Sequence, residues 1–143
     1  MKIIYCIDSL SSSGGTERVL STKVNWLAQQ KNIEVILISI KEDKPPFFYL
    51  HNKVRHIVLD INLKNRDAYK NALIKIVEKE HPDVTVAVSG YAVKVLPTLK
   101  DRSKKILEFH YTKNFLVNFV KGIQHLRFRQ LHILKMKWLQ WKL

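Results

Sequence analysis

A loop rich in serine and glycine follows the first apolar run of the chain and could bind a phosphate group. The loop spans residues 11–15, and Gly14 and Gly15 stand at its end, directly before a pattern typical of a helix. The first backbone N–H groups of a helix have no partner within the helix, and the helix dipole is positive there. Because glycine lets a ligand approach the backbone closely, this loop predicts an anion site. The alternative is a plain turn that needs two flexible residues.

Two polar side chains at the start of this helix could belong to the same site. Thr16 is a plausible helix cap, and we expect it to bind the phosphate together with Gly14 and Gly15. Glu17 could contact a ligand, but an acid that the helix dipole stabilises in the first turn explains it equally well. The serines at 11–13 could donate hydrogen bonds to a phosphate or simply face water.

Two further loops hold residues that could take part in the same chemistry. Ser89 and Gly90 follow an apolar run, and His110 follows another. An imidazole has an ordinary pKa of about 6.5 and can donate or accept a proton at neutral pH, so His110 is the candidate catalytic residue. No pair of histidines has the spacing of metal ligands, and we expect neither a metal site nor a bound cofactor.

Short apolar runs that alternate with amphipathic segments place these loops in a common framework. The apolar runs predict strands at residues 3–7, 33–40, 55–60, 84–88 and 105–109. Helical spacing predicts helices at about 16–31, 68–79 and 93–99. Alternating strands and helices imply right-handed crossovers and a parallel sheet with helices on both faces, a Rossmann-like α/β fold. Ligands bind beyond the carboxyl ends of such strands, where we expect the three loops to meet.

The size and composition of the chain are those of one folded domain with an extension. It has 143 residues, of which 46% are hydrophobic, enough to bury a core. We assign residues 1–112 to a Rossmann-like domain and residues 113–143 to a basic helix that extends from it. Cys6 is the single cysteine, and we expect it to be an inert thiol buried in the first strand.

The net charge of +13 is concentrated toward the end of the chain. All twelve acidic residues lie at or before Glu108, and the basic residues beyond it have no compensating acid. These are Lys113, Lys121, Arg127, Arg129, Lys135, Lys137 and Lys142. Such a local positive field attracts anionic lipid, nucleic acid or a phosphorylated ligand, and charge alone does not select among them. An anionic membrane surface is therefore one expected partner.

The extension also carries apolar residues at helical spacing. The stripe consists of Phe115, Leu116, Phe119, Val120, Ile123, Leu126, Leu131, Leu134, Trp138 and Trp141. Met136, Leu139 and Leu143 lie off this stripe and form a second apolar side. We expect a further domain, a partner or a lipid surface to bury that side. The sequence has no apolar stretch of membrane-spanning length and no signal-peptide core, which predicts a cytoplasmic protein that could associate with the inner face of the membrane.

The chain resembles the N-terminal half of GT-B glycosyltransferases of family 4. The resemblance begins with the first strand, the segment 12–20 with its Gly-Gly-Thr-Glu-Arg sequence, and the strand that starts at Glu34. It continues through a strand that ends in the histidine turn at 108–111. The last match is the long helix that in this family runs toward the second domain, so the resemblance covers about the whole chain.

The resemblance implies one of two Rossmann-like domains that face each other across a cleft. The N-terminal domain of such enzymes binds mainly the acceptor, and the C-terminal domain binds most of the nucleotide-sugar donor. Gly14 and Gly15 would approach the donor diphosphate, and His110 would line the sugar site. A full member is more than twice as long, so the chain is expected to be the acceptor-side part of a larger or split enzyme. Its partners would be a nucleotide-sugar donor, a glycan or lipid-linked acceptor and the missing C-terminal domain.

Two other classes of function fit parts of the sequence. A dinucleotide-binding dehydrogenase domain requires the loop G-x-G-x-x-G and an acid about twenty residues further on. Here the glycines are adjacent, Thr16 and Arg18 stand where further glycines would be needed, and Glu42 comes late. A basic module that binds nucleotides, nucleic acid or a membrane surface without catalysis fits the extension, where aromatic and basic residues interleave.

Overall fold

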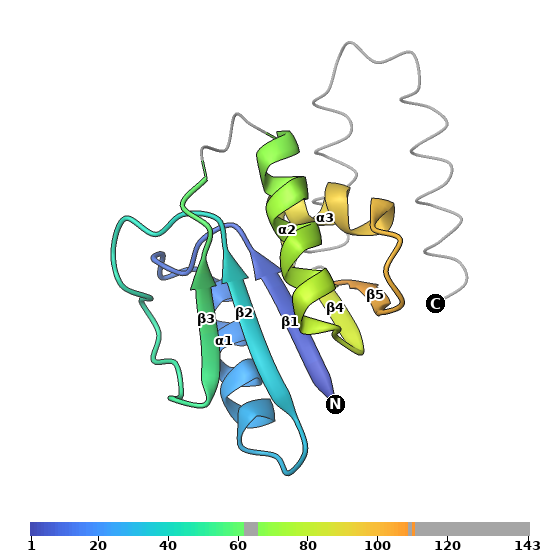
Figure 1. Ribbon diagram of the computed structural model, residues 1–143. Helices are drawn as coiled ribbons and strands as arrows, with labels where there is room; N and C mark the ends of the chain where they lie inside the picture. The colour runs from blue at the N-terminus through green and yellow to red at the C-terminus, as the bar shows by residue number, and fades with distance from the viewer. Residues whose placement is uncertain (62–65, 109, 111–143) are drawn as a thin grey trace, which may run out of the picture. The chain divides into compact units, whose positions relative to one another are not determined.

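The apolar runs of the sequence form a sheet of five parallel strands (Figure 1). The computed structural model describes residues 1–61, 66–108 and 110. The strands are β1 (Lys2–Ile7), β2 (Glu34–Ser39), β3 (Val54–Val58), β4 (Val84–Ala87) and β5 (Lys104–Leu107). They lie in the order β3-β2-β1-β4-β5, with every neighbouring pair parallel. This is the order of a doubly wound α/β sheet, so the expected Rossmann-like fold is confirmed.

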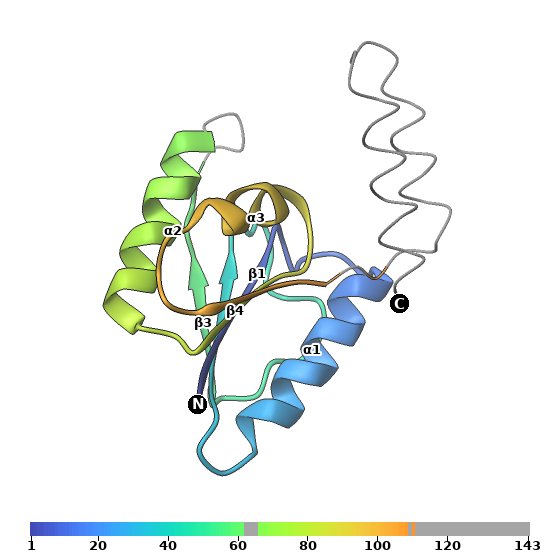
Figure 2. The same ribbon diagram turned by 90° about the vertical axis from the view of Figure 1, so that its right-hand side faces the viewer.

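Helices cover both faces of this sheet (Figure 2). They are α1 (Gly15–Ala28), α2 (Arg66–Glu80), α3 (Gly90–Val95) and the single 3-10 turn η1 (Leu96–Thr98). The helix α1 packs on one face, whereas α2 and α3 pack on the other. Helices on opposite faces follow from right-handed crossovers, because the chain moves from β1 toward one edge of the sheet and later from β4 toward the other.

Alternate residues of β1 contribute to two separate cores. Tyr5 belongs to the cluster that contains Leu20 of α1, whereas Ile4 and Cys6 belong to the cluster that contains Leu73 of α2. A central strand of a parallel sheet is buried on both faces, which explains why its sequence is a continuous apolar run. Burial raises the pKa of the Cys6 thiol to about 12, which supports the expectation of an inert cysteine.

Several element boundaries differ from those predicted. The helix α1 ends at Ala28 rather than at residue 31, because the chain then turns into β2 through Asn32, whose φ is 66°. The helix α3 begins at Gly90 rather than at residue 93, because Ser89 already stands in the extended conformation of an N-cap residue. The strand β5 ends at Leu107.

The chain divides into two compact units. Residues 1–109 form one unit, and residues 110–143 form a second. The predicted helix over 113–143, with its apolar stripe and its basic residues, lies outside the described residues. Within the described part of the chain, no helix is long and apolar enough to cross a membrane.

Candidate functional site at the carboxyl edge of the sheet

The loops that follow β1 and β4 lie at the same edge of the sheet. The two strands are neighbours, with Cys6 paired to Ala87. The chain nevertheless continues from β1 into α1 on one face and from β4 into α3 on the other. Open α/β sheets bind ligands where neighbouring strands diverge in this way. The fold therefore brings the predicted loops 11–15 and 89–90 to the place where a ligand site is expected.

The first part of the β1–α1 loop is fixed by an acid that comes after β2. The backbone N–H of Leu10 donates to Glu42 Oε1 at 2.7 Å, and the Ser9 hydroxyl donates to Glu42 Oε2 at 2.8 Å. Ser9 Oγ also lies 2.9 Å from Ser11 Oγ. Glu42 further lines a cavity of about 390 Å³ together with His56. From the sequence, Glu42 was considered only as an acid that comes too far along the chain to bind a ribose. Its role in holding the loop was not predicted, because the contact joins residues 33 positions apart.

The start of α1 differs from the prediction in its capping residue. Gly14 is the N-cap residue and makes no side-chain cap, so the expectation that Thr16 caps the helix is wrong. Thr16 lies inside the first turn because the chain enters helical geometry at Gly15. Thr16 still lies at the predicted anion site, and its binding role stays a prediction.

A carboxylate of the chain itself occupies the region beside this helix start. The Ser12 hydroxyl donates to Glu17 Oε1 at 2.7 Å, and the Gly14 N–H lies 3.4 Å from Ser12 Oγ. A Cβ atom added to Gly14 would collide with Glu17 Oε2, which lies at the end of a flexible side chain. An acid at this position is stabilised by the helix dipole, as expected for Glu17. A ligand phosphate at the helix start would therefore meet a carboxylate that must turn aside.

The two glycines of greatest interest have opposite surroundings. Gly15 is exposed, and a Cβ atom added to it would meet nothing within 4 Å. Gly90 has a φ of +60°, and an added Cβ atom would overlap the carboxylate of Asp8. The fold itself thus requires glycine at Gly90, whereas no contact of the described residues requires it at Gly15.

Asp8 is a second residue at this edge whose role the sequence did not predict. It follows the last residue of β1, and its Oδ1 accepts a hydrogen bond of 3.2 Å from the backbone N–H of Tyr91 in α3. Burial raises the pKa of Asp8, against the hydrogen bond from Tyr91, which lowers it. Tyr69 of α2 is buried nearby, and burial, with the charges of Cys6 and Asp8, raises its pKa as well. The sequence marks Asp8 only as the end of an apolar run.

The last three predicted site residues are Ser89, Gly90 and His110. Ser89 is the N-cap residue of α3, its side chain makes no cap hydrogen bond, and it precedes Gly90 at the predicted edge. A ligand-binding role for Ser89 and Gly90 stays a prediction. His110 belongs to the second unit of the chain, so its catalytic role also stays a prediction.

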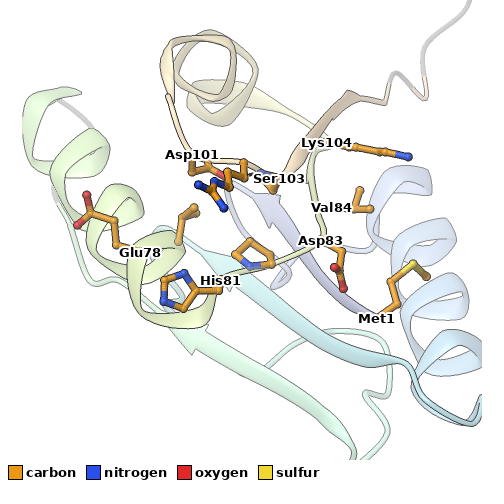
Figure 3. A pocket seen from close by; sticks show the side chains of 11 residues that line it. Met1, Glu78, His81, Asp83, Val84, Asp101, Ser103 and Lys104 are labelled. Carbon is orange, nitrogen blue, oxygen red and sulfur yellow. Dashed lines mark hydrogen bonds between the residues drawn. The ribbon is translucent and has the colours of Figure 1, made fainter.

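A large cavity lies at the opposite edge of the sheet, where the strands begin. It has a volume of about 1010 Å³ and is lined by the end of α2, the start of β4 and the loop before β5 (Figure 3). Glu78 of α2 and His81, directly after the end of α2, line one part of it, and Asp101 and Ser103 of the loop line another. Asp101 is engaged within the chain, since its Oδ1 lies 2.5 Å from Lys105 Nζ. None of the predicted site residues lines this cavity.

The carboxyl edge is the better candidate for a ligand site, although the large cavity lies at the other end of the strands. The N-terminus of α1, with its unpaired N–H groups and positive dipole end, opens at the carboxyl edge and not at the other. The described residues contain no group of three metal-ligating side chains. No protein-family model matches the chain, and no curated protein sequence is significantly similar to it. Its function is therefore inferred from the fold and from this edge.

Proposed function

We propose that this chain is the acceptor-side domain of a glycosyltransferase that moves a sugar from a nucleotide-sugar donor to a glycan or lipid-linked acceptor. The doubly wound sheet and the position of the loops after β1 and β4 support the proposal. The likeness of the first strand, the glycine loop and the first helix to GT-B enzymes of family 4 supports it further. A second domain would complete the cleft, so this chain alone would transfer no sugar.

The observation that carries the proposal is the open space at Gly15. Glycine costs conformational entropy, and here neither a positive φ nor a neighbouring atom within the described residues demands it. A group from outside that must come close to the backbone explains the residue. The phosphates of a nucleotide sugar are such a group, because they would meet the N–H groups at the start of α1.

The chemistry of this site would be electrostatic. When the sugar departs, negative charge develops on the leaving diphosphate, and fixed N–H donors stabilise it in the transition state. The hydrogen bonds from Leu10 and Ser9 to Glu42 hold the loop in place before the ligand arrives. Such preorganisation removes the cost of ordering the donors during the reaction. In this proposal His110 contacts the transferred sugar.

The experiment that tests the proposal compares two variants of α1, one at its first residue and one further along it. Full-length chain is titrated with inorganic pyrophosphate, UDP and GDP while NMR follows the amides of Gly15 and Thr16. We expect Gly15→Val to weaken binding by about tenfold or more, equivalent to about 1.4 kcal/mol, because a branched side chain blocks the approach. Thr22→Val, at an exposed position two turns further along α1, is the matched control and should bind within about twofold of the parent.

The outcomes of this titration distinguish two explanations for Gly15, namely the close approach of a phosphate and a plain turn. Equal affinity of the Gly15→Val variant and the parent would return Gly15 to a plain turn residue. Circular dichroism of both variants checks that the fold is retained. Binding of pyrophosphate without preference for any nucleotide would place the nucleotide determinants outside this domain, as the proposal expects.

A second proposal concerns the basic segment 113–143, which lies outside the described residues. We infer from its seven uncompensated cations and its aromatic residues that it binds anionic membrane surfaces. Co-sedimentation with acidic vesicles should be strong at low salt and fall as salt rises, because charge screening shortens to about 8 Å at physiological ionic strength. Neutral vesicles should bind poorly. Equal binding to both kinds of vesicle would reject an electrostatic role.

A further inference from the structure

The outer strands of the described sheet, β3 and β5, differ in the side chains that they present to an added strand. At one edge, Arg55 of β3 forms ion pairs with Glu34 of β2 and Glu80 of α2. Glu80 also accepts a bond of 3.1 Å from Lys2. The charge of Arg55 is therefore already paired within the chain, and it offers little to a charged partner.

The other edge strand, β5, presents apolar side chains on both of its faces. Ile106 is 47% exposed and Leu107 is 40% exposed. Their partners across the ladder to β4 are Val86, which is 3% exposed, and Ala87, which is fully buried. The register thus places Ile106 on the face of α1 and Leu107 on the face of α2 and α3. Apolar residues on both faces are the mark of an inner strand of a parallel sheet.

The helix α1 adds exposed apolar surface on the side that faces β5. The Lys23 ammonium pairs with the carboxylate of Glu108, directly after β5, which fixes that side of the helix. Val19 and Trp26 lie four residues before and three residues after Lys23, hence on the same side. Both are exposed, Trp26 by 62%. We call Val19, Trp26, Ile106 and Leu107 together the β5 surface.

The charges beside the β5 surface indicate what could cover it. Three exposed cations, Lys100, Arg102 and Lys104, precede Ile106 and have no carboxylate partner within the described residues. A second copy of this chain would bring the same cations together, and the basic segment 113–143 would add more of them. Like charges in register oppose strand pairing. Charge complementarity therefore favours an acidic occupant.

We propose that β5 is a docking strand, to which an acidic segment of a partner protein adds as a sixth strand of the sheet. Backbone hydrogen bonds along the side of β5 that pairs with none of the described strands would supply affinity, as in other cases of strand addition. Two adjacent apolar side chains of the segment, one on each face of the sheet, would pack against Ile106 and Leu107. Its acids would pair with Arg102 and Lys104. This inference is independent of the glycosyltransferase proposal, because the β5 surface contains none of the residues of the glycine loop.

The test uses the full chain and a short blocked peptide in which glutamates at one end are followed by adjacent valines, so that the valines can reach both faces of the sheet. We expect the peptide to slow hydrogen exchange of the β5 amides and to bind about tenfold more tightly than the same peptide with lysine in place of glutamate. Ile106→Asn, which removes the apolar contact without adding a charge, should weaken binding by about tenfold, or 1.4 kcal/mol. Val58→Asn is the matched control, since Val58 is 44% exposed on the opposite edge strand and should leave binding unchanged.

Each contrary outcome overturns the proposal. Equal binding of the glutamate and lysine peptides would remove the role of charge, and full binding by the Ile106→Asn variant would place the peptide elsewhere. Sedimentation of the chain without peptide tests whether something else covers the surface. A concentration-dependent dimer that Ile106→Asn abolishes would assign the surface to a second copy. A monomer whose β5 amides are already protected would assign it to the chain itself.

Discussion

Gly15 and Gly90 follow neighbouring strands at the same edge of the sheet, yet they are glycines for different reasons. At Gly90 the reason lies inside the chain, because the backbone has a φ of +60° and Asp8 occupies the space of a Cβ atom. At Gly15 an added Cβ atom would meet no atom of the described residues within 4 Å. Glycines at the edge of a sheet where ligands bind therefore do not all have the same physical cause. Only the glycine that the fold does not require points to a group from outside.

The contrast extends to the carboxylates beside the two glycines. Asp8 is partly buried and holds α3 through the Tyr91 N–H, so it acts as part of the scaffold. Glu17 has a flexible side chain whose tip is held by Ser12. The β4–α3 side of the edge is thus fixed by its own contacts, whereas the β1–α1 side ends in a group that can move away. The proposed phosphate site lies on the adjustable side.

The substitution with the largest expected effect is Gly90→Ala. The positive φ and the overlap with Asp8 should together lower the free energy of unfolding by about 2–4 kcal/mol. Thermal or urea unfolding measures this loss. In the double variant with Asp8→Ala the overlap disappears, so the loss from Gly90→Ala should shrink to that of backbone strain alone. An unchanged loss would show that the carboxylate contributes nothing to the requirement for glycine.

Gly15→Ala should have a smaller effect of the opposite sign on stability. The backbone at Gly15 is compatible with any residue, and alanine restricts the unfolded chain more than glycine does, so we expect a gain of about 0.5 kcal/mol. Urea unfolding of this variant beside Gly90→Ala gives the sharpest form of the comparison. A loss of stability at Gly15 similar to that at Gly90 would erase the distinction on which the proposed phosphate site depends.

The sequence predicted those features that depend on neighbours along the chain. Buried strands appear as apolar runs because both faces of each inner strand are covered, as the residues of β1 illustrate. It did not predict that Asp8 faces Gly90 or that Glu42 binds the β1–α1 loop, because these contacts join segments far apart in the chain. The error over Thr16 has a local cause, since capping depends on the backbone angle at which the chain enters the helix.

Glu17→Gln should strengthen anion binding by about twofold to fivefold. Removing the charge relieves repulsion of a phosphate at the helix start, and a charge at this position is worth about 0.3–1 kcal/mol. Glutamine can still accept the hydrogen bond from Ser12, so the loop keeps its form. Titration with pyrophosphate measures the change, which should diminish at high salt. Glu78→Gln is the matched control, because Glu78 is an exposed acid at the amino ends of the strands, and it should leave the affinity unchanged. Unchanged affinity in Glu17→Gln would mean that the phosphate does not meet Glu17.

The smallest expected effect is the dependence of stability on the charge of Asp8. Its pKa in the folded chain is raised by burial, so its contribution to stability is fully present below the ordinary aspartate pKa of about 3.9 and is lost as pH rises through the folded value. Asp8→Asn keeps an acceptor for Tyr91 but carries no charge. The variant should therefore melt above the parent at neutral pH, and the difference should vanish at acidic pH. A parent that is more stable than Asp8→Asn at pH 7 would mean that the Tyr91 hydrogen bond to a charged oxygen outweighs the cost of burial. The scaffold role of Asp8 would then depend on its charge, and the contrast with the movable carboxylate of Glu17 would have to be drawn from mobility alone.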